Sequence, residues 1–420
     1  MAWEKLTHSR RRSVILPIAL SAVWMALVVA GARLTNFDEP YLPFAIAGAL
    51  AFFLRGAPSR WEIYAWLSIS VIFVKVIHLS QIPFWVLRVA SGSAALGFGA
   101  LVLLGLRALW SEREARDNTL ALLVPSLVLV FFIFVSGNVL RLSGGLAPQT
   151  DDAWLYASDG SLGFQPSFFV GRIMYSSIVL TRSAMLTYLS LPFAMAVVCA
   201  GQIRPGGRTV SRHVLTVLLI AGVAGWLLYN VVPATGPIYA FGKDFPWGGL
   251  SYKDLSTFAL QKMPISTGIP RNGMPSLHVA WAVLLFWNSR GLSRALRAAL
   301  LLYVLVTVFA TLGTGQHYLV DLVVSLPFAL TVQSMADFTL GRKSQRLAAI
   351  LAGVGLTIVW LVCVRFGVSW LLKSPLVPWS LVLFTTSITL WLASRLSNDA
   401  TSAGERSRFA APQSMVHSMR

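Results

Sequence analysis

The chain reads Arg271-Asn272-Gly273-Met274-Pro275-Ser276-Leu277-His278 just before one apolar run, and Gly315-Gln316-His317-Tyr318-Leu319-Val320-Asp321 just before another. Two histidines and an aspartate therefore stand at the ends of hydrophobic segments. Ionisable side chains are costly inside a bilayer, so a functional reason is expected where they occur. The pattern predicts a membrane enzyme whose reactive site lies in the second half of the 420 residues.

The composition also indicates a membrane protein. Hydrophobic residues make up 56% of the chain and charged residues 12%, whereas soluble domains have roughly 45–50% and about 25%. The net charge of +18 would favour nucleic acid in a soluble protein, but the basic residues lie in short loops and tails, as the positive-inside rule describes. We expect no nucleic-acid partner. Cys199 and Cys363 lack metal-ligand spacing, and we expect no metal or other cofactor.

Apolar segments predict an all-α fold with about twelve transmembrane helices, since a spanning helix needs about 20 mainly apolar residues. The candidate spans are 14–31, 40–54, 61–80, 84–109, 118–140, 173–201, 214–233, 275–289, 298–314, 317–336, 347–366 and 377–394. The Arg/Lys-rich connections fall on one side of this count, and we expect that side and both termini to be cytoplasmic. The aspartate-bearing loops 141–172 and 234–274 should face the periplasm or cell exterior, with the protein in a bacterial inner membrane.

His317 and Asp321 are four positions apart, so on a helix they lie one turn apart on one face. A carboxylate there can bind one imidazole nitrogen and leave the other free as a nucleophile or base. Taken alone, the pair is equally compatible with a hydrogen bond that only fixes the end of a span.

The first polar stretch favours the catalytic interpretation, because the helical hairpin that follows His278 returns the chain to the same membrane face at the pair. Pro275 and Ser276 suit a helix N-terminus, where free backbone N–H groups favour an anion. Arg271 adds a permanent cation with a planar donor fork. We therefore predict a phosphate site whose binding residues are Arg271, Ser276 and Asn272.

Three further residues are weaker candidates for a headgroup pocket. Tyr229 and Asn230 end the seventh expected span on the same side as the site, although a Pro/Gly-rich helix stop also accounts for that segment. Gln316 directly precedes His317.

The two stretches resemble the second and third signature motifs of the type 2 phosphatidic acid phosphatase superfamily, in the form Met274-Pro275-Ser276-Leu277-His278 and His317-Tyr318-Leu319-Val320-Asp321. Ser-Leu-His in place of Ser-Gly-His resembles the inositol phosphorylceramide synthase-like branch. The resemblance covers about residues 214–336. It implies that the histidine at 317 attacks phosphorus, that the aspartate at 321 orients it, and that the histidine at 278 protonates the leaving oxygen.

The sequence departs from the superfamily pattern at the phosphate-binding cations. Val197 stands where the first motif has lysine, and Ala310 and Thr311 stand where the third usually has Ser-Arg. Arg271 is the leading substitute, and other outer-loop cations are alternatives: Lys262, Lys243 and Arg172. These losses resemble the phosphotransferase branch more than simple phosphatases.

The expected organisation has five parts. They are N-terminal transmembrane helices of unassigned role (1–140), an extracytoplasmic loop (141–172), a phosphatidic acid phosphatase type 2-like catalytic core of the six-helix type (173–340), C-terminal transmembrane helices (341–396) and a disordered cytoplasmic tail (397–420).

The leading functional prediction is a phosphotransferase that moves an inositol-phosphate-like headgroup between lipids through a phosphohistidine. Its partners are then a membrane lipid phosphate or phosphodiester and a lipid hydroxyl acceptor. A lipid phosphate phosphatase is the first alternative. A secondary transporter is the second, because intramembrane His and Asp side chains can relay protons; that function favours groups near the bilayer midplane and repeated halves, neither of which the sequence indicates.

Overall fold

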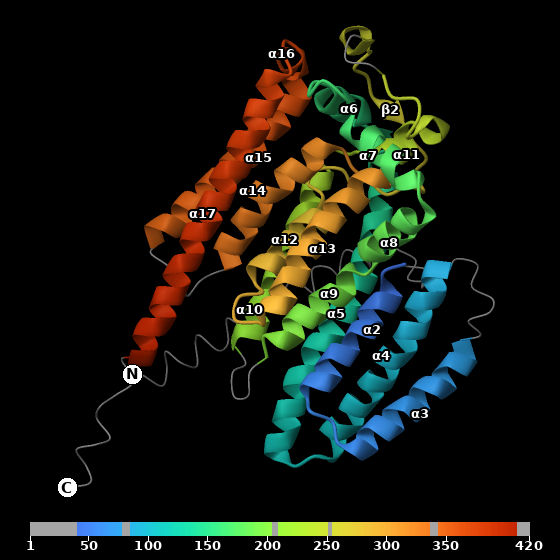
Figure 1. The fold of residues 1–420 in the computed structure, drawn as a ribbon, viewed down its shortest axis with the longest axis vertical. Helices are drawn as coiled ribbons and strands as arrows, with labels where there is room; N and C mark the ends of the chain where they lie inside the picture. The colour runs from blue at the N-terminus through green and yellow to red at the C-terminus, as the bar shows by residue number, and fades with distance from the viewer. Residues whose placement is uncertain (1–39, 78–84, 204–208, 251–253, 337–342, 410–420) are drawn as a thin grey trace.

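The computed structural model describes residues 40–77, 85–203, 209–250, 254–336 and 343–409. The predicted all-α class is confirmed, because almost every described segment is helical (Figure 1). One two-stranded antiparallel sheet, β1 (Gln149–Thr150) with β2 (Met263–Pro264), is found among these residues. The expected first span, 14–31, lies outside the described residues.

The N-terminal helices pack closely through small residues. They are α2 (Leu42–Arg55), α3 (Arg60–Ile77), α4 (Trp85–Trp110) and α5 (Arg113–Leu146). A Cβ added at Gly97 of α4 would collide with the backbone of Ile46 in α2, and one at Gly48 would meet Ala196 of α9. Such contacts between small residues are the usual means by which membrane helices approach one another.

The central helices carry both polar stretches and occupy the middle of the molecule (Figure 1). They are α6 (Asp152–Gly160), α7 (Pro166–Tyr175), α8 (Ile178–Leu189), α9 (Leu191–Gly201), α10 (Thr209–Tyr229), α11 (Pro237–Ala240), η2 (Gly242–Asp244), η3 (Asp254–Thr257), α12 (Leu277–Trp287), α13 (Arg294–Gly313) and α14 (Leu319–Ala336). The largest buried apolar cluster joins α2, α4, α5 and α9 to α10, α12, α13 and α14. The N-terminal and central helices therefore share one core.

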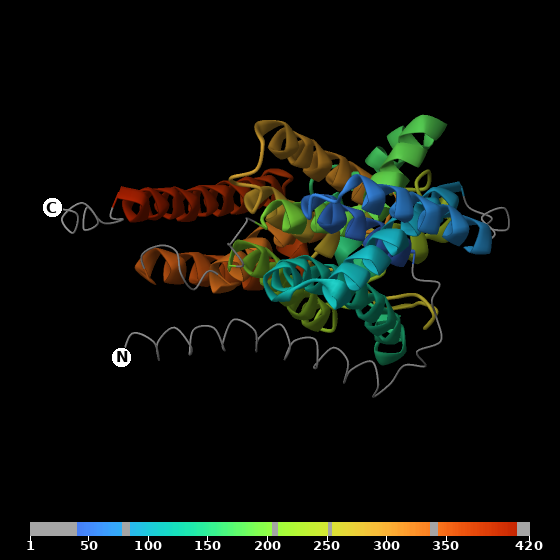
Figure 2. The ribbon, with the colours of Figure 1, turned by 90° about the horizontal axis from the view of Figure 1, so that it is seen from below.

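The C-terminal helices lie at one side of the molecule, where α15 and α17 pack against α14 (Figures 1 and 2). They are α15 (Lys343–Phe366), α16 (Val368–Leu371) and α17 (Leu376–Phe409). The disordered tail expected from residue 397 is wrong as far as residue 409, because α17 continues to Phe409. The sequence has no proline between Pro378 and Pro412 that would stop this helix. Residues 410–420 lie outside the described part.

Among the described residues, fewer helices than the expected spans meet the length criterion for crossing a membrane. In the described part of the chain, six helices are long and apolar enough to cross a membrane, or seven if α8 and α9 form one span. That pair, expected as the single span 173–201, is bent by 52°, with Pro192 just after the break. Helices α2, α10 and α12 are apolar but shorter. The count of about twelve therefore overestimates the helices that satisfy the length criterion.

The expected extracytoplasmic loop 141–172 is largely helical. Helix α5 extends through it as far as Leu146, and α6 and α7 occupy most of the rest. Asp152, Asp159 and Phe168 are almost fully buried there. The segment is therefore a packed part of the molecule, and it adjoins both predicted motifs.

Candidate active site

His317 and Asp321 form the predicted pair at the start of α14. The imidazole Nδ1 lies 3.3 Å from Asp321 Oδ2, and both side chains are buried. The same carboxylate oxygen accepts the Tyr318 backbone N–H at 2.9 Å. His317 precedes the first helical residue, Leu319, so the contact forms across the N-terminal turn of α14. A proton on Nδ1 directed at the carboxylate leaves Nε2 as the free nitrogen.

His278 faces the same cavity from the first turn of α12. The cavity has a volume of about 470 Å³, and both His278 and His317 line it. The His278 ring stacks on Tyr188 of α8, with ring centroids 3.8 Å apart and 13° between the planes, and Tyr41 approaches it at 5.4 Å. Among the described residues His278 Nε2 has no hydrogen-bond partner, so this nitrogen is available to a ligand.

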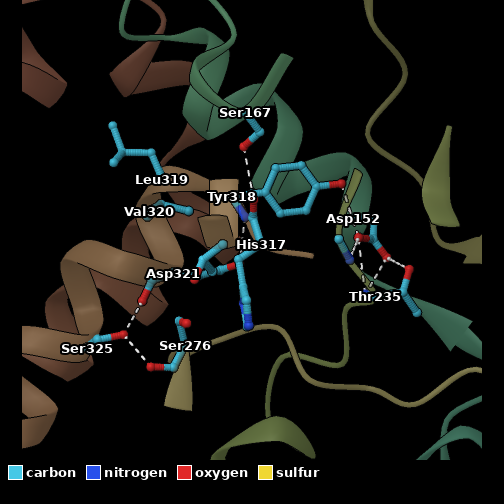
Figure 3. Close-up of polar contacts among 12 residues, drawn as sticks. Asp152, Ser167, Thr235, Ser276, His317, Tyr318, Leu319, Val320, Asp321 and Ser325 are labelled. Atoms are coloured by element: carbon cyan, nitrogen blue, oxygen red, sulfur yellow. Dashed lines mark hydrogen bonds and ion pairs between the residues drawn. The ribbon is translucent and has the colours of Figure 1, made fainter. Parts of the chain in front are cut away.

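A short polar bridge joins the two motifs (Figure 3). The Ser276 N–H donates to the Asp321 backbone carbonyl at 3.2 Å. The Ser325 hydroxyl lies 2.8 Å from the carbonyl oxygens of both Ser276 and Asp321. Because these contacts involve main-chain atoms of both motifs, they fix the start of α12 against α14.

The residues predicted for phosphate and headgroup binding divide into two groups. Asn272, Gln316 and Tyr229 line the cavity. Ser276 is fully buried, and Asn230 donates to the Trp226 carbonyl at 2.8 Å; neither lines the cavity.

Arg271 is fully buried, and its guanidinium binds backbone carbonyls. Its Nε donates to Ala147 at 2.7 Å, Nη1 to Ile269 at 2.6 Å and Ser266 at 3.2 Å, and Nη2 to Ile265 at 2.9 Å. Burial lowers the pKa of Arg271 from its usual value. Arg271 is absent from the cavity lining, and this geometry indicates a structural role in place of the predicted phosphate contact.

Sequence reasoning missed several residues of the site. Arg141, near the end of α5, lines the cavity, whereas Lys262, one of the alternative cations, pairs with Asp151 at 2.8 Å. Arg141, like His317, is an ionisable residue at the end of an apolar run, and this pattern could have identified it. The two buried aspartates of α6 were missed as well.

The cavity walls are mainly apolar and come from both the N-terminal and the central helices. The apolar lining residues are Pro40, Tyr41, Ile133, Leu140, Met185, Tyr188, Leu189, Leu191, Pro192, Trp226, Tyr229, Tyr239, Pro270, Leu277 and Trp281. Within the described residues, no group of three or more His, Cys, Asp and Glu side chains could hold a metal ion. The polar side chains in the cavity lining are those of histidine, amide, hydroxyl and arginine residues.

Comparison with known proteins agrees with this chemistry at a broad level. Residues 153–335 match the family model described as the PAP2 superfamily, whose members are phosphatases and phosphotransferases. No curated protein and no solved structure matches the chain. The match includes both motifs and starts inside α6. It confirms the superfamily resemblance for this part of the chain and leaves the inositol phosphorylceramide synthase-like branch unconfirmed.

Proposed function

We propose that this protein is a membrane phosphotransferase that moves a phosphorylated, inositol-phosphate-like headgroup from one lipid to the hydroxyl of another through a phosphohistidine on His317. The observation that carries the proposal is the meeting of His317, with its carboxylate Asp321, and His278 at one cavity. Apolar walls suit lipid chains, and the amides of Asn272 and Gln316 suit a polar headgroup.

The first half-reaction forms a bond between His317 Nε2 and phosphorus. The Asp321 carboxylate accepts a hydrogen bond from the Nδ1–H group, which orients the ring and stabilises the positive charge that develops on it. As the bond from phosphorus to the leaving oxygen breaks, protonated His278 donates its proton to that oxygen. Such general acid catalysis typically contributes about 10²- to 10⁴-fold to a rate.

The second half-reaction restores the enzyme. Neutral His278 takes the proton of the acceptor hydroxyl, whose oxygen attacks phosphorus. The nitrogen–phosphorus bond breaks, and its electron pair returns to His317. A lipid hydroxyl as acceptor gives transfer, and water gives hydrolysis. The buried pair and the apolar walls support transfer, because both limit the access of water to the phosphohistidine.

We propose an extracytoplasmic site in a bacterial inner membrane. The motifs adjoin the aspartate-bearing loops, whereas Arg290, Arg294 and Arg297 follow α12 at its other end. With intact spheroplasts, a membrane-impermeant headgroup analogue added outside should inhibit turnover. Inhibition only after lysis would place the site on the cytoplasmic side.

The test is turnover by purified protein on lipid phosphates and phosphodiesters, with and without hydroxyl acceptors. We expect a new lipid that requires an acceptor, and a loss of more than about 10³-fold in His317→Ala. The matched control is His213→Ala, because His213 contacts Gln333 in α14 and does not line the cavity. Acceptor-independent release of phosphate would establish the phosphatase, and full activity of His317→Ala would refute both enzymes.

A further inference from the structure

Helix α6 lies beside the active site and carries two aspartates seven residues apart, Asp152 and Asp159. Seven residues are close to two helical turns, so both side chains project from one face. Both are almost completely buried. Burying a carboxylate is costly unless hydrogen bonds compensate, and the partners of these two show what they do.

Asp159 caps helix α14, which carries Asp321. Its Oδ2 accepts the Leu319 N–H at 2.7 Å, and its Oδ1 accepts the Val320 N–H at 2.9 Å. The first N–H groups of a helix have no partner within it, and a negative charge is favourable at that end. The cap normally comes from the residue before the helix, but here it comes from a separate helix about 160 residues earlier in the chain.

Asp152 joins two segments of the chain that adjoin the site. Its Oδ1 accepts the Tyr318 hydroxyl at 3.1 Å and the Gly236 N–H at 2.9 Å, and its Oδ2 accepts the Thr235 N–H at 3.0 Å and hydroxyl at 3.1 Å (Figure 3). The neighbouring Ala234 carbonyl accepts the Asn272 N–H at 2.9 Å. Asp152 therefore ties the residue after His317 to the loop that supports Asn272.

The segment around His317 is held at several points by residues distant in sequence. The Gly315 carbonyl accepts the Ile238 N–H at 2.9 Å, and the His317 carbonyl accepts the Ser167 hydroxyl of α7 at 2.9 Å (Figure 3). The next residues bind Asp152 and Asp159. None of these contacts uses the imidazole or the Asp321 side chain, so they can fix the position of the pair without taking part in its chemistry.

We infer that Asp152 and Asp159 are positioning residues, and that α6 acts as a clamp that holds the His317 nucleophile at the distance and angle required for attack on phosphorus. The inference rests on the proposed function. Nucleophilic attack depends steeply on geometry, and a displacement of about 1 Å can cost about 10²-fold in rate. Substrate binding depends on the cavity walls, which lie mostly on other elements.

The two oxygens of the Asp159 carboxyl are both part of this arrangement. Burial raises the pKa of Asp159 to about 8, the backbone N–H groups of Leu319 and Val320 oppose the shift, and the nearby Asp321 adds to it. Both carboxylate oxygens face N–H donors. An amide at this position would keep one acceptor and direct its NH₂ group at the other N–H. Asp159→Asn therefore removes one of the two capping hydrogen bonds while preserving side-chain size.

The test compares steady-state kinetics of Asp159→Asn with wild type. We expect kcat to fall about 10- to 100-fold while KM for the lipid phosphate changes less than about twofold. The matched control is Asp151→Asn, because Asp151 pairs with Lys262 and Arg365 and contacts neither motif through its side chain; its kcat should equal that of wild type. A folding defect alone would lower the fraction of active enzyme and would therefore slow both half-reactions equally. For this reason the rate of the first half-reaction is measured by rapid quench and expressed per active site.

A second variant tests the clamp independently if Asp159→Asn folds poorly. Tyr318→Phe removes only the hydroxyl that binds Asp152, and we expect a smaller kcat loss of about 3- to 10-fold. If Asp152 acts partly through that hydroxyl, the combined loss in Asp152→Asn/Tyr318→Phe will be less than the product of the single losses. Wild-type kcat in both Asp159→Asn and Tyr318→Phe, in an enzyme that still requires His317, would overturn the clamp; full activity of His317→Ala would refute the proposed function itself.

Discussion

Arg271 shows why a charged side chain beside a motif is not by itself a ligand. Its five donors form a planar fork, and four backbone carbonyls from the end of α5 and the 265–269 segment surround that fork. A fully buried arginine with all three nitrogens bonded would have to leave these carbonyls unpaired in order to bind phosphate. Such unpaired groups are costly.

We predict that Arg271→Lys will lower the stability of the folded protein by at least about 2 kcal/mol, because one ammonium cannot replace the fork and hydrogen bonds to charged groups contribute about 1.5–3 kcal/mol. KM of the remaining folded enzyme should be unchanged. Thermal unfolding and steady-state kinetics measure the two effects, with Arg60→Lys, at the exposed start of α3, as control. A tenfold rise in KM at unchanged stability would instead support the phosphate contact predicted from sequence.

The sequence singles out His278, His317 and Asp321, because ionisable residues at the ends of apolar runs stand out against the cost of burying them, and the structure brings the three residues together. It could not predict the partners of Arg271, which depend on the path of a loop. Nor did it predict Asp152 and Asp159, since aspartates in a presumed outer loop look like ordinary solvated residues. Their spacing of seven, within a short helical segment, is the signal that could have identified them.

The turn before α11 fixes the spacing between two parts of the site. Gly236 has a φ of +86°, a conformation that favours glycine, and a Cβ there would collide with the carbonyl of Gln316. The turn and the segment just before His317 are thus in direct contact, and only a residue without a side chain permits it.

We expect Gly236→Ala to displace the segment that carries His317 and to lower kcat about 10-fold or more. The positive φ adds a strain of about 1–3 kcal/mol. The control is Gly242→Ala, which has a similar φ of +53° but open space around the added methyl group. It should show the strain as a modest loss of thermal stability with unchanged kcat. Equal kinetics for the two variants would contradict a role for the Gly236 contact.

Helix boundaries were predictable where apolar runs are continuous and capped. Helix α13 begins after Ser293, whose hydroxyl accepts the Leu296 N–H, and its predicted range was close to the observed one. The span expected at 173–201 was wrong in shape, because Ser190 and Pro192 interrupt the apolar run and the chain bends there. Periodicity alone could not place this bend or show that Tyr188, just before it, stacks on His278.

All three groups of helices contribute to the site. The N-terminal helices, to which sequence assigned no role, supply Ile133 and Leu140 to the cavity wall. The central helices carry the histidines. The C-terminal helices contact the segment that joins α6 to α7, because Trp379 of α17 donates to the Leu162 carbonyl at 3.1 Å. The reactive segment is therefore placed by contacts that extend through the described chain.

The most direct test of the account is a search for the covalent intermediate. Purified protein is mixed with a phosphodiester lipid carrying a labelled phosphorus, quenched within milliseconds in alkali, and digested for peptide mapping. We predict an acid-labile, alkali-stable label on the peptide that contains His317, removed by adding a hydroxyl acceptor and absent from His317→Ala. Turnover that proceeds without any labelled protein, or a label that persists in His317→Ala, would contradict it.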